Sequence, residues 1–192
     1  MHIRTQIADQ ILACCLLAAT SAFGSAQASA PAKPAVGTVM APSAEYGKLL
    51  SLLEKEFVSA AEAMPEDKYD FSPPAGAGDF KGVRSFGDQV KHVAQANGYF
   101  FHDPNKPMVD DAASFDKLKT KAEIVKALKD SFAHAHAYVD AITPENAFVM
   151  TANGTRGEMA AFGMAHLMDH YGQMAVYLRM NNIIPPASRK GM

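Results

Sequence analysis

Tryptophan is absent from this 192-residue sequence, and cysteine occurs only twice, at Cys14 and Cys15. Both cysteines fall in an N-terminal segment that we expect to be removed. The remaining chain then has no disulfide bond, no cysteine nucleophile and no thiolate ligand for a metal. Any metal site or reactive group must therefore be built from other side chains.

The sequence also lacks a marked excess of charge and has no run of basic residues. Its 18 Lys and Arg residues and 20 Asp and Glu residues give a formal net charge of −2. Proteins that bind nucleic acids usually carry a concentrated basic surface, because contacts with phosphates supply much of their affinity. We therefore expect no nucleic-acid partner.

The N-terminus has the features of a secretory signal peptide. Arg4 precedes an apolar run at residues 11–19, which is too short to cross a bilayer as a mature helix. The small residues at 26–28 (Ala-Gln-Ala) form the best cleavage site, so residues 1–28 are predicted to be removed. We expect a periplasmic or secreted protein without a stable membrane anchor after cleavage; an uncleaved anchor is the alternative. Acylation at Cys14 or Cys15 is excluded, because no apolar core precedes them.

Residues 29–42 are rich in Ala, Pro and Ser, which predicts a disordered tether. The length of the rest, residues 43–192, fits one domain. Within this domain, apolar residues recur at three- and four-residue steps, and this spacing predicts four helices. They cover about residues 43–63, 85–101, 120–142 and 155–181.

Four helices of this length favour an all-α fold, a four-helix bundle. Thr120 with Glu123, and Thr155 with Glu158, have the spacing of capping boxes that open the third and fourth helices. The connection between the second and third helices is about eighteen residues long, which permits an up-down-down-up path. Residues 147–154 combine a short strand-like stretch with an Asn-Gly turn, which predicts a small hairpin.

The last helix carries His166 and His170, four residues apart. Side chains at this spacing share a helical face, and two neutral imidazoles can bind one zinc, nickel, copper or iron ion. Leu167 follows the first histidine where a zinc protease would have Glu, so that chemistry is not indicated. The alternative is a pair of structural histidines without a metal.

His92 is the best third ligand, because it lies in the middle of the second predicted helix beside its inner face. Cofactor sites in bundles are built from side chains on facing helices. His134 and His136 are two residues apart and cannot both face inward, while His102 lies at a helix end. A metal site of His92, His166 and His170 predicts ring nitrogens within roughly 3 to 4 Å of one another. Metal binding should fade below the ordinary histidine pKa of about 6.5.

Several segments together resemble the DinB-like four-helix-bundle superfamily, which also includes bacillithiol S-transferases and the N-terminal domain of mycothiol-dependent maleylpyruvate isomerase. The resemblance covers about residues 44–189 and implies an up-down-down-up bundle. It also implies a divalent metal ion, with zinc or nickel favoured, held by His92, His166 and His170. Asn182 stands where the family would have Gly. The matching segments are residues 64–73 (MPEDKYDFSP), 84–87 (RSFG), 92–97 (HVAQAN), 166–173 (HLMDHYGQ), 177–181 (YLRMN) and 184–186 (IPP).

Four more polar residues are candidates around this metal. Asp88 lies one turn before His92, and Asp169 lies near the histidine face of the last helix, so either can orient a ligand imidazole. Gln173 and Tyr177 continue the histidine stripe and are candidates for contact with a substrate. Core packing and a buried polar hydrogen bond are the alternative roles for these two residues.

These features favour an exported metal-dependent hydrolase or other Lewis-acid enzyme that acts on a small molecule. A metal-dependent thiol S-transferase is one alternative; it is less favoured, because an exported protein seldom meets the cytosolic thiols that such enzymes use. A non-catalytic protein of the cell envelope that binds a metal or small ligand is another. A homodimer is left open.

Overall fold

The computed structural model describes residues 33–108 and 112–190. The predicted signal peptide, residues 1–28, and the first four residues of the predicted tether lie outside this part of the chain. Residues 33–38 are exposed and contain one turn, without a helix or strand. Residues from Val39 onwards form a separate compact unit. None of the helices described is both long enough and apolar enough to cross a membrane.

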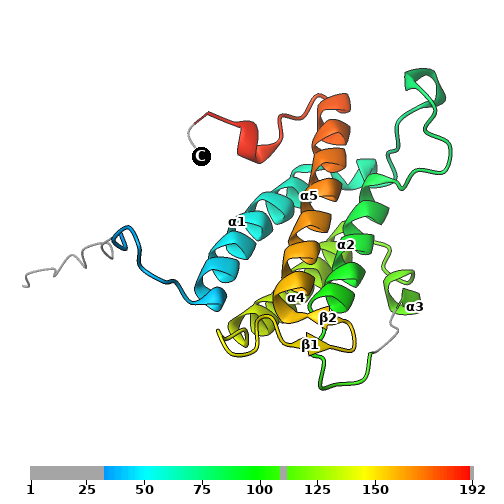
Figure 1. The fold of residues 1–192 in the computed structure, drawn as a ribbon. Coiled ribbons are helices and arrows are strands. Elements are labelled where there is room, and N and C mark those ends of the chain that lie inside the picture. Colours follow the sequence, from blue (N-terminus) through cyan, green and yellow to red (C-terminus); the bar gives the residue numbers. More distant parts are fainter. Residues whose placement is uncertain (1–32, 109–111, 191–192) are drawn as a thin grey trace, which may run out of the picture. The chain divides into compact units, whose positions relative to one another are not determined.

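The compact unit is built mainly from four long helices (Figure 1). A short helix, α3, precedes α4, and a two-stranded antiparallel hairpin precedes α5. The all-α prediction is therefore confirmed. The bounds are α1 Pro42–Ala63, α2 Phe86–Phe100, α3 Ala112–Phe115, α4 Lys121–Asp140, β1 Met150–Thr151, β2 Gly154–Thr155 and α5 Arg156–Met180, with 3-10 turns η1 Glu66–Lys68, η2 Ala75–Ala77 and η3 Pro186–Ser188.

Local sequence signals determine where the last two long helices begin and where α5 ends. Both capping boxes form: the side chains of Thr120 and Thr155 accept hydrogen bonds from the backbone three residues on, and the glutamates reach back. At the end of α5, Asn182 has a φ of 60°. The backbone N–H groups of Asn182 and Ile183 donate to Arg179 and Leu178 in a Schellman motif. Asn is thus an effective substitute for Gly at this position.

In the bundle, α1 and α2 each pack against both α4 and α5. Glu54 of α1 contacts His136 of α4, and Glu62 of α1 contacts Lys129 of α4, so the residue numbers rise along one helix and fall along the other. These two helices are therefore antiparallel.

Contacts also give the directions of α2 and α5. Gln89 meets Gln173 and Phe100 meets Phe162, so α2 and α5 are antiparallel. Tyr46, near the start of α1, lies beside the start of α5, as expected for a parallel pair. These senses agree with an up-down-down-up path, although the topology as a whole stays a prediction.

Tight packing between α2 and α5 brings the two helices together near the end of α2. A Cβ atom added at Gly163 of α5 would lie 2.8 Å from the ring of Phe101 and 2.9 Å from Cβ of Phe100. Phe101 is fully buried. Any side chain at residue 163 would therefore push α5 away from α2, the two helices that carry the histidines.

We expect Gly163→Ala to destabilise the protein. Overpacking costs about 1–3 kcal/mol, whereas replacing Gly by Ala in a helix returns about 1 kcal/mol, so the net loss reaches about 2 kcal/mol. Gly172→Ala is the matched control, because a Cβ atom there meets nothing within 4 Å; it should raise stability by about 0.5–1 kcal/mol. Urea unfolding measures both. Equal stabilities for the two variants would contradict the close contact at Gly163.

Candidate metal centre

Three histidines from two helices converge between α2 and α5. His92 lies on α2, and His166 and His170 lie one turn apart on α5. Nε2 of His166 is 3.2 Å from Nε2 of His92 and 3.1 Å from Nε2 of His170. Each ring offers a nitrogen, and these three atoms lie within 4.8 Å of one another. The structure thus brings together the three residues singled out in the sequence.

A chain of hydrogen bonds determines which nitrogen of His170 is available. Nδ1–H of His170 donates a short hydrogen bond to the side-chain carbonyl of Gln89. Because that oxygen can only accept, the single proton of neutral His170 must be on Nδ1, and Nε2 carries a lone pair. Nε2 of Gln89 in turn donates to Oε1 of Gln173 at 2.8 Å, and Nε2 of Gln173 donates to Asp169 at 3.3 Å.

The arrangement of the three rings fits a divalent metal ion. Nε2 of His166 is close to Nε2 of both His92 and His170, and Nε2 of His170 carries no proton. A single proton on Nε2 of His92 or His166 can therefore form a hydrogen bond in only one of these two contacts. Hydrogen bonds between neutral rings therefore leave a repulsive contact, whereas one cation can accept all three lone pairs. Tetrahedral zinc with bonds of 2.0–2.1 Å separates its ligand nitrogens by about 3.3 Å, close to the 3.2 Å and 3.1 Å between Nε2 of His166 and Nε2 of His92 and His170.

Burial keeps these rings neutral. Desolvation disfavours the charged imidazole and lowers the pKa of His92 to about 4, with further lowering by the charges of Arg84 and His166. Desolvation is also the main cause for His170, which is only 6% exposed and has a pKa of about 4. The pKa of His166 is lowered by burial, against the opposing charge of Asp169. Protons therefore compete with a metal at lower pH than the expectation of about 6.5.

The two acidic candidates have different surroundings. Asp88 accepts a hydrogen bond from Ser85 at 2.8 Å and pairs with Lys91 at 2.7 Å. Burial alone would raise the pKa of Asp88, but these two partners lower it overall. Its carboxylate thus holds Ser85, the N-cap residue of α2, and Lys91 instead of orienting His92. Asp169 reaches the histidines through the two glutamines described above.

The two substrate-binding candidates are held within the protein. The hydroxyl of Tyr177 donates to the backbone carbonyl of Arg84 at 3.2 Å, and its ring packs edge-on against Phe71. Tyr177 is buried, which raises the pKa of its hydroxyl. This side chain therefore has the core-packing role. Gln173 is half-buried and connects Gln89 to Asp169, so its polar groups support His170.

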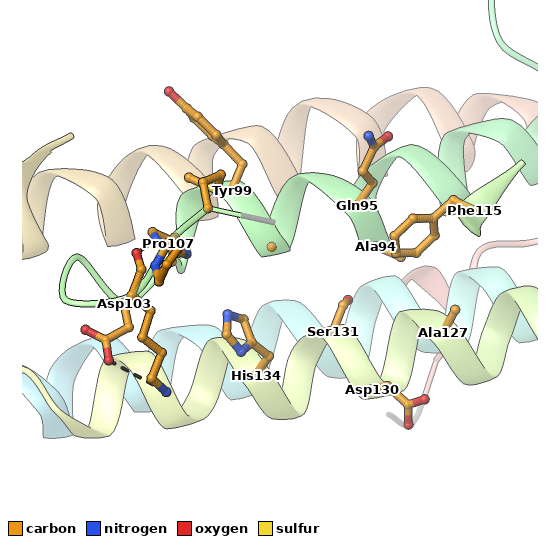
Figure 2. Close-up of a pocket in the computed structure, with 14 residues that line it drawn as sticks. Ala94, Gln95, Tyr99, Asp103, Pro107, Phe115, Ala127, Asp130, Ser131 and His134 are labelled. Carbon is orange, nitrogen blue, oxygen red and sulfur yellow. Dashed lines mark hydrogen bonds and ion pairs between the residues drawn. The ribbon is translucent and has the colours of Figure 1, made fainter. Parts of the chain in front are cut away.

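The other described histidines lie outside the cluster. His136 pairs with Glu54 at 2.8 Å, and Nε2 of His102 bonds to the carbonyl of Lys106 at 2.7 Å. His134 lines a cavity of about 630 Å³ between α2 and α4, together with Ser131. Figure 2 shows both side chains pointing from α4 towards α2. None of the three clustered histidines lines this cavity.

Gln89 was not predicted from the sequence, although it makes the contact that orients His170. It is a buried polar residue on the inner face of α2, between the core residues Phe86 and Val90. It also lies one turn before His92. A polar residue at an otherwise apolar position, three residues from a candidate ligand, is the signal that could have found it.

Taken together, the structure is a helical bundle with a three-histidine cluster between two antiparallel helices. A family model described as the DinB superfamily matches residues 49–174, which is more than half of the chain. The protein therefore belongs to the DinB superfamily. No curated protein matches the sequence.

We expect Gln89→Leu to weaken metal binding about 10- to 100-fold, since it removes the acceptor that fixes the tautomer of His170. Gln95→Leu makes the same change on the same helix, outside the hydrogen-bond chain, and should leave affinity unchanged. Titration of each purified variant with zinc in the presence of a competing chelator measures the difference, with circular dichroism to check folding. Equal zinc affinities in folded Gln89→Leu and wild type would contradict this role.

The histidine cluster should also make the metal-free protein less stable in mild acid. Unfolded histidine binds a proton below about pH 6.5, whereas His92 and His170 stay neutral in the folded state down to about pH 4. Unfolding thus takes up protons, and stability falls as pH drops through this window.

Urea unfolding in excess chelator between about pH 6.5 and pH 5 measures this slope. His92→Gln should flatten it, and His134→Gln, a control on α4 outside the cluster, should not. Identical slopes in wild type and His92→Gln would show that burial of His92 does not control the effect.

Proposed function

We propose that this protein is an exported, metal-dependent hydrolase or other Lewis-acid enzyme that acts on a small molecule. The observation that carries the proposal is the convergence of three imidazole Nε2 atoms, with Nδ1–H of His170 donating to Gln89. This arrangement prepares lone pairs for one ion without a carboxylate in the ligand set. Zinc and nickel suit such a set of neutral imidazoles.

A divalent ion with three imidazole ligands would keep open coordination positions, where it supplies Lewis acidity that polarises a carbonyl or acidifies water. The residues around it have separate tasks. Gln89 holds the ring of His170 in place, and Phe100 packs against His166 at a ring-centroid distance of 5.0 Å. The positive charge of Arg84 acts on all three histidines, and it favours a substrate with negative or developing negative charge.

Access to the cluster supports an enzyme over a sealed structural site. His170 is buried, but His92 and His166 are only partly buried, so two of the three side chains of the cluster are in contact with solvent. The signal-like sequence at residues 1–28 supports export. Export in turn separates the protein from the cytosolic thiols that the family's thiol transferases use, which favours hydrolysis over thiol transfer.

The test begins with metal content. Protein purified without a histidine tag should contain about one divalent ion per chain by elemental analysis, as expected for one three-ligand site. His92→Ala, His166→Ala and His170→Ala should each weaken zinc binding by more than about 100-fold, because loss of a ligand exceeds the effect of its supporting residues. His102→Ala is the control and should bind zinc like wild type. Unchanged metal content in His170→Ala would reject the site.

Activity then separates the candidate functions. The metal-loaded protein should hydrolyse members of a panel of esters and amides, and His170→Ala should not. If the protein turns over only pairs of a thiol and an electrophile, the activity is S-transfer and not hydrolysis. Tight metal binding without turnover of any of these substrates would favour the non-catalytic binding protein.

A further inference from the structure

An aromatic cluster extends from the histidine site to the surface of the bundle. Phe100 of α2 is at its centre: its ring lies 5.0 Å from the ring of His166, 5.1 Å from that of Phe162 and 5.2 Å from that of Tyr99, between centroids. The contacts with Phe162 and Tyr99 are edge-on, the geometry that aromatic pairs prefer. We call Tyr99, Phe100 and Phe162 the aromatic cluster.

The helices place this cluster on the same face as the histidines. Phe162 lies four residues before His166 on α5, and Tyr99 lies seven residues after His92 on α2, so each continues the face that carries a histidine. Because α2 and α5 are antiparallel, both side chains extend towards the same end of the bundle. They lie about 6 Å and 10 Å along the helices from His166 and His92.

The outer rings of the cluster are largely open to solvent. Tyr99 is 54% exposed and Phe162 is 61% exposed, whereas Phe100 is buried beneath them. Tyr99 also borders the cavity between α2 and α4, but Figure 2 shows its ring extending away from α4. Single exposed apolar residues are common, but here two exposed rings pack on one buried ring that also packs against His166, so the three aromatic residues and His166 form a continuous series of ring contacts.

From this continuity we infer that Tyr99 and Phe162 form a subsite for an aromatic group of the molecule that binds at the histidine centre. The inference rests on the proposed function and narrows its substrate class to aryl-bearing small molecules. Phe162 lies about 6 Å along α5 from His166. An aromatic ring of the ligand that is a few atoms away from its metal-binding group can therefore reach Phe162. It would cover the exposed face of Phe162 and add edge-on contacts with Tyr99.

Two hydroxamates test the subsite directly, because benzohydroxamic acid and acetohydroxamic acid share a metal-binding group and differ in a phenyl or a methyl group. Calorimetric titration of the zinc-loaded protein should show benzohydroxamic acid binding about tenfold more tightly, as expected for one added aromatic contact. Phe162→Ala should reduce this preference at least threefold, and Tyr99→Leu should reduce it in the same direction.

Phe148→Ala is the matched control, since Phe148 is 76% exposed and lies outside the aromatic cluster; it should keep the wild-type preference. All variants should keep wild-type zinc affinity. A preference that is absent in wild type, or unchanged in Phe162→Ala and Tyr99→Leu, would overturn the subsite while leaving the metal site in place. Failure of the wild-type protein to bind zinc would instead overturn the proposed function, and the subsite with it.

Discussion

The hydrogen bond from Nδ1–H of His170 to Gln89 is the interaction on which the histidine centre depends. It crosses from α5 to α2 in a buried position and leaves Nε2 of His170 with its lone pair directed at His166. Rings held in this way repel unless something accepts their lone pairs. The polar interior of the α2–α5 contact can therefore accommodate a positive ion, whereas the other buried side chains of the described residues are apolar apart from Asn97.

The same helix contact connects the metal centre with the aromatic surface. Gly163 lets α5 approach Phe100 and Phe101 closely, and Phe100 then lies against both His166 and Phe162. A glycine on one helix and a phenylalanine pair on the other thus determine how far the histidines are separated. The residues that pack α2 against α5 also contact the histidines, so a substitution that alters this packing would also alter the geometry of the histidine cluster.

Local signals made much of the fold predictable. The apolar spacing and the capping boxes at Thr120 and Thr155 located the helices to within one or two residues. Asn182, which stands where the family would have Gly, adopts the left-handed conformation that Gly favours. The pair His166 and His170 followed from spacing on one helix. His92 was only a favoured third member, since no local pattern connects α2 with α5.

The supporting residues could not be predicted in the same way. Asp88 lies four residues before His92 and Gln89 lies three before it, yet Asp88 bonds to Ser85 and Lys91, whereas Gln89 turns inward to His170. Adjacent positions on a helix point about 100° apart, so the packing of α5 decides which of them reaches the site. The same packing decides that Tyr177 is buried against Phe71.

The position of His92 has a consequence for the chain as a whole. It is separated from His166 by 74 residues, and the only cysteines in the sequence are Cys14 and Cys15. An ion shared by these histidines would act as a cross-link that closes this long loop, much as a disulfide would. Cross-links of this kind restrict the unfolded chain more strongly as the loop lengthens. A bound ion would thus be a reversible cross-link between α2 and α5. Its formation would depend on the supply of metal and not on the redox state of the surroundings.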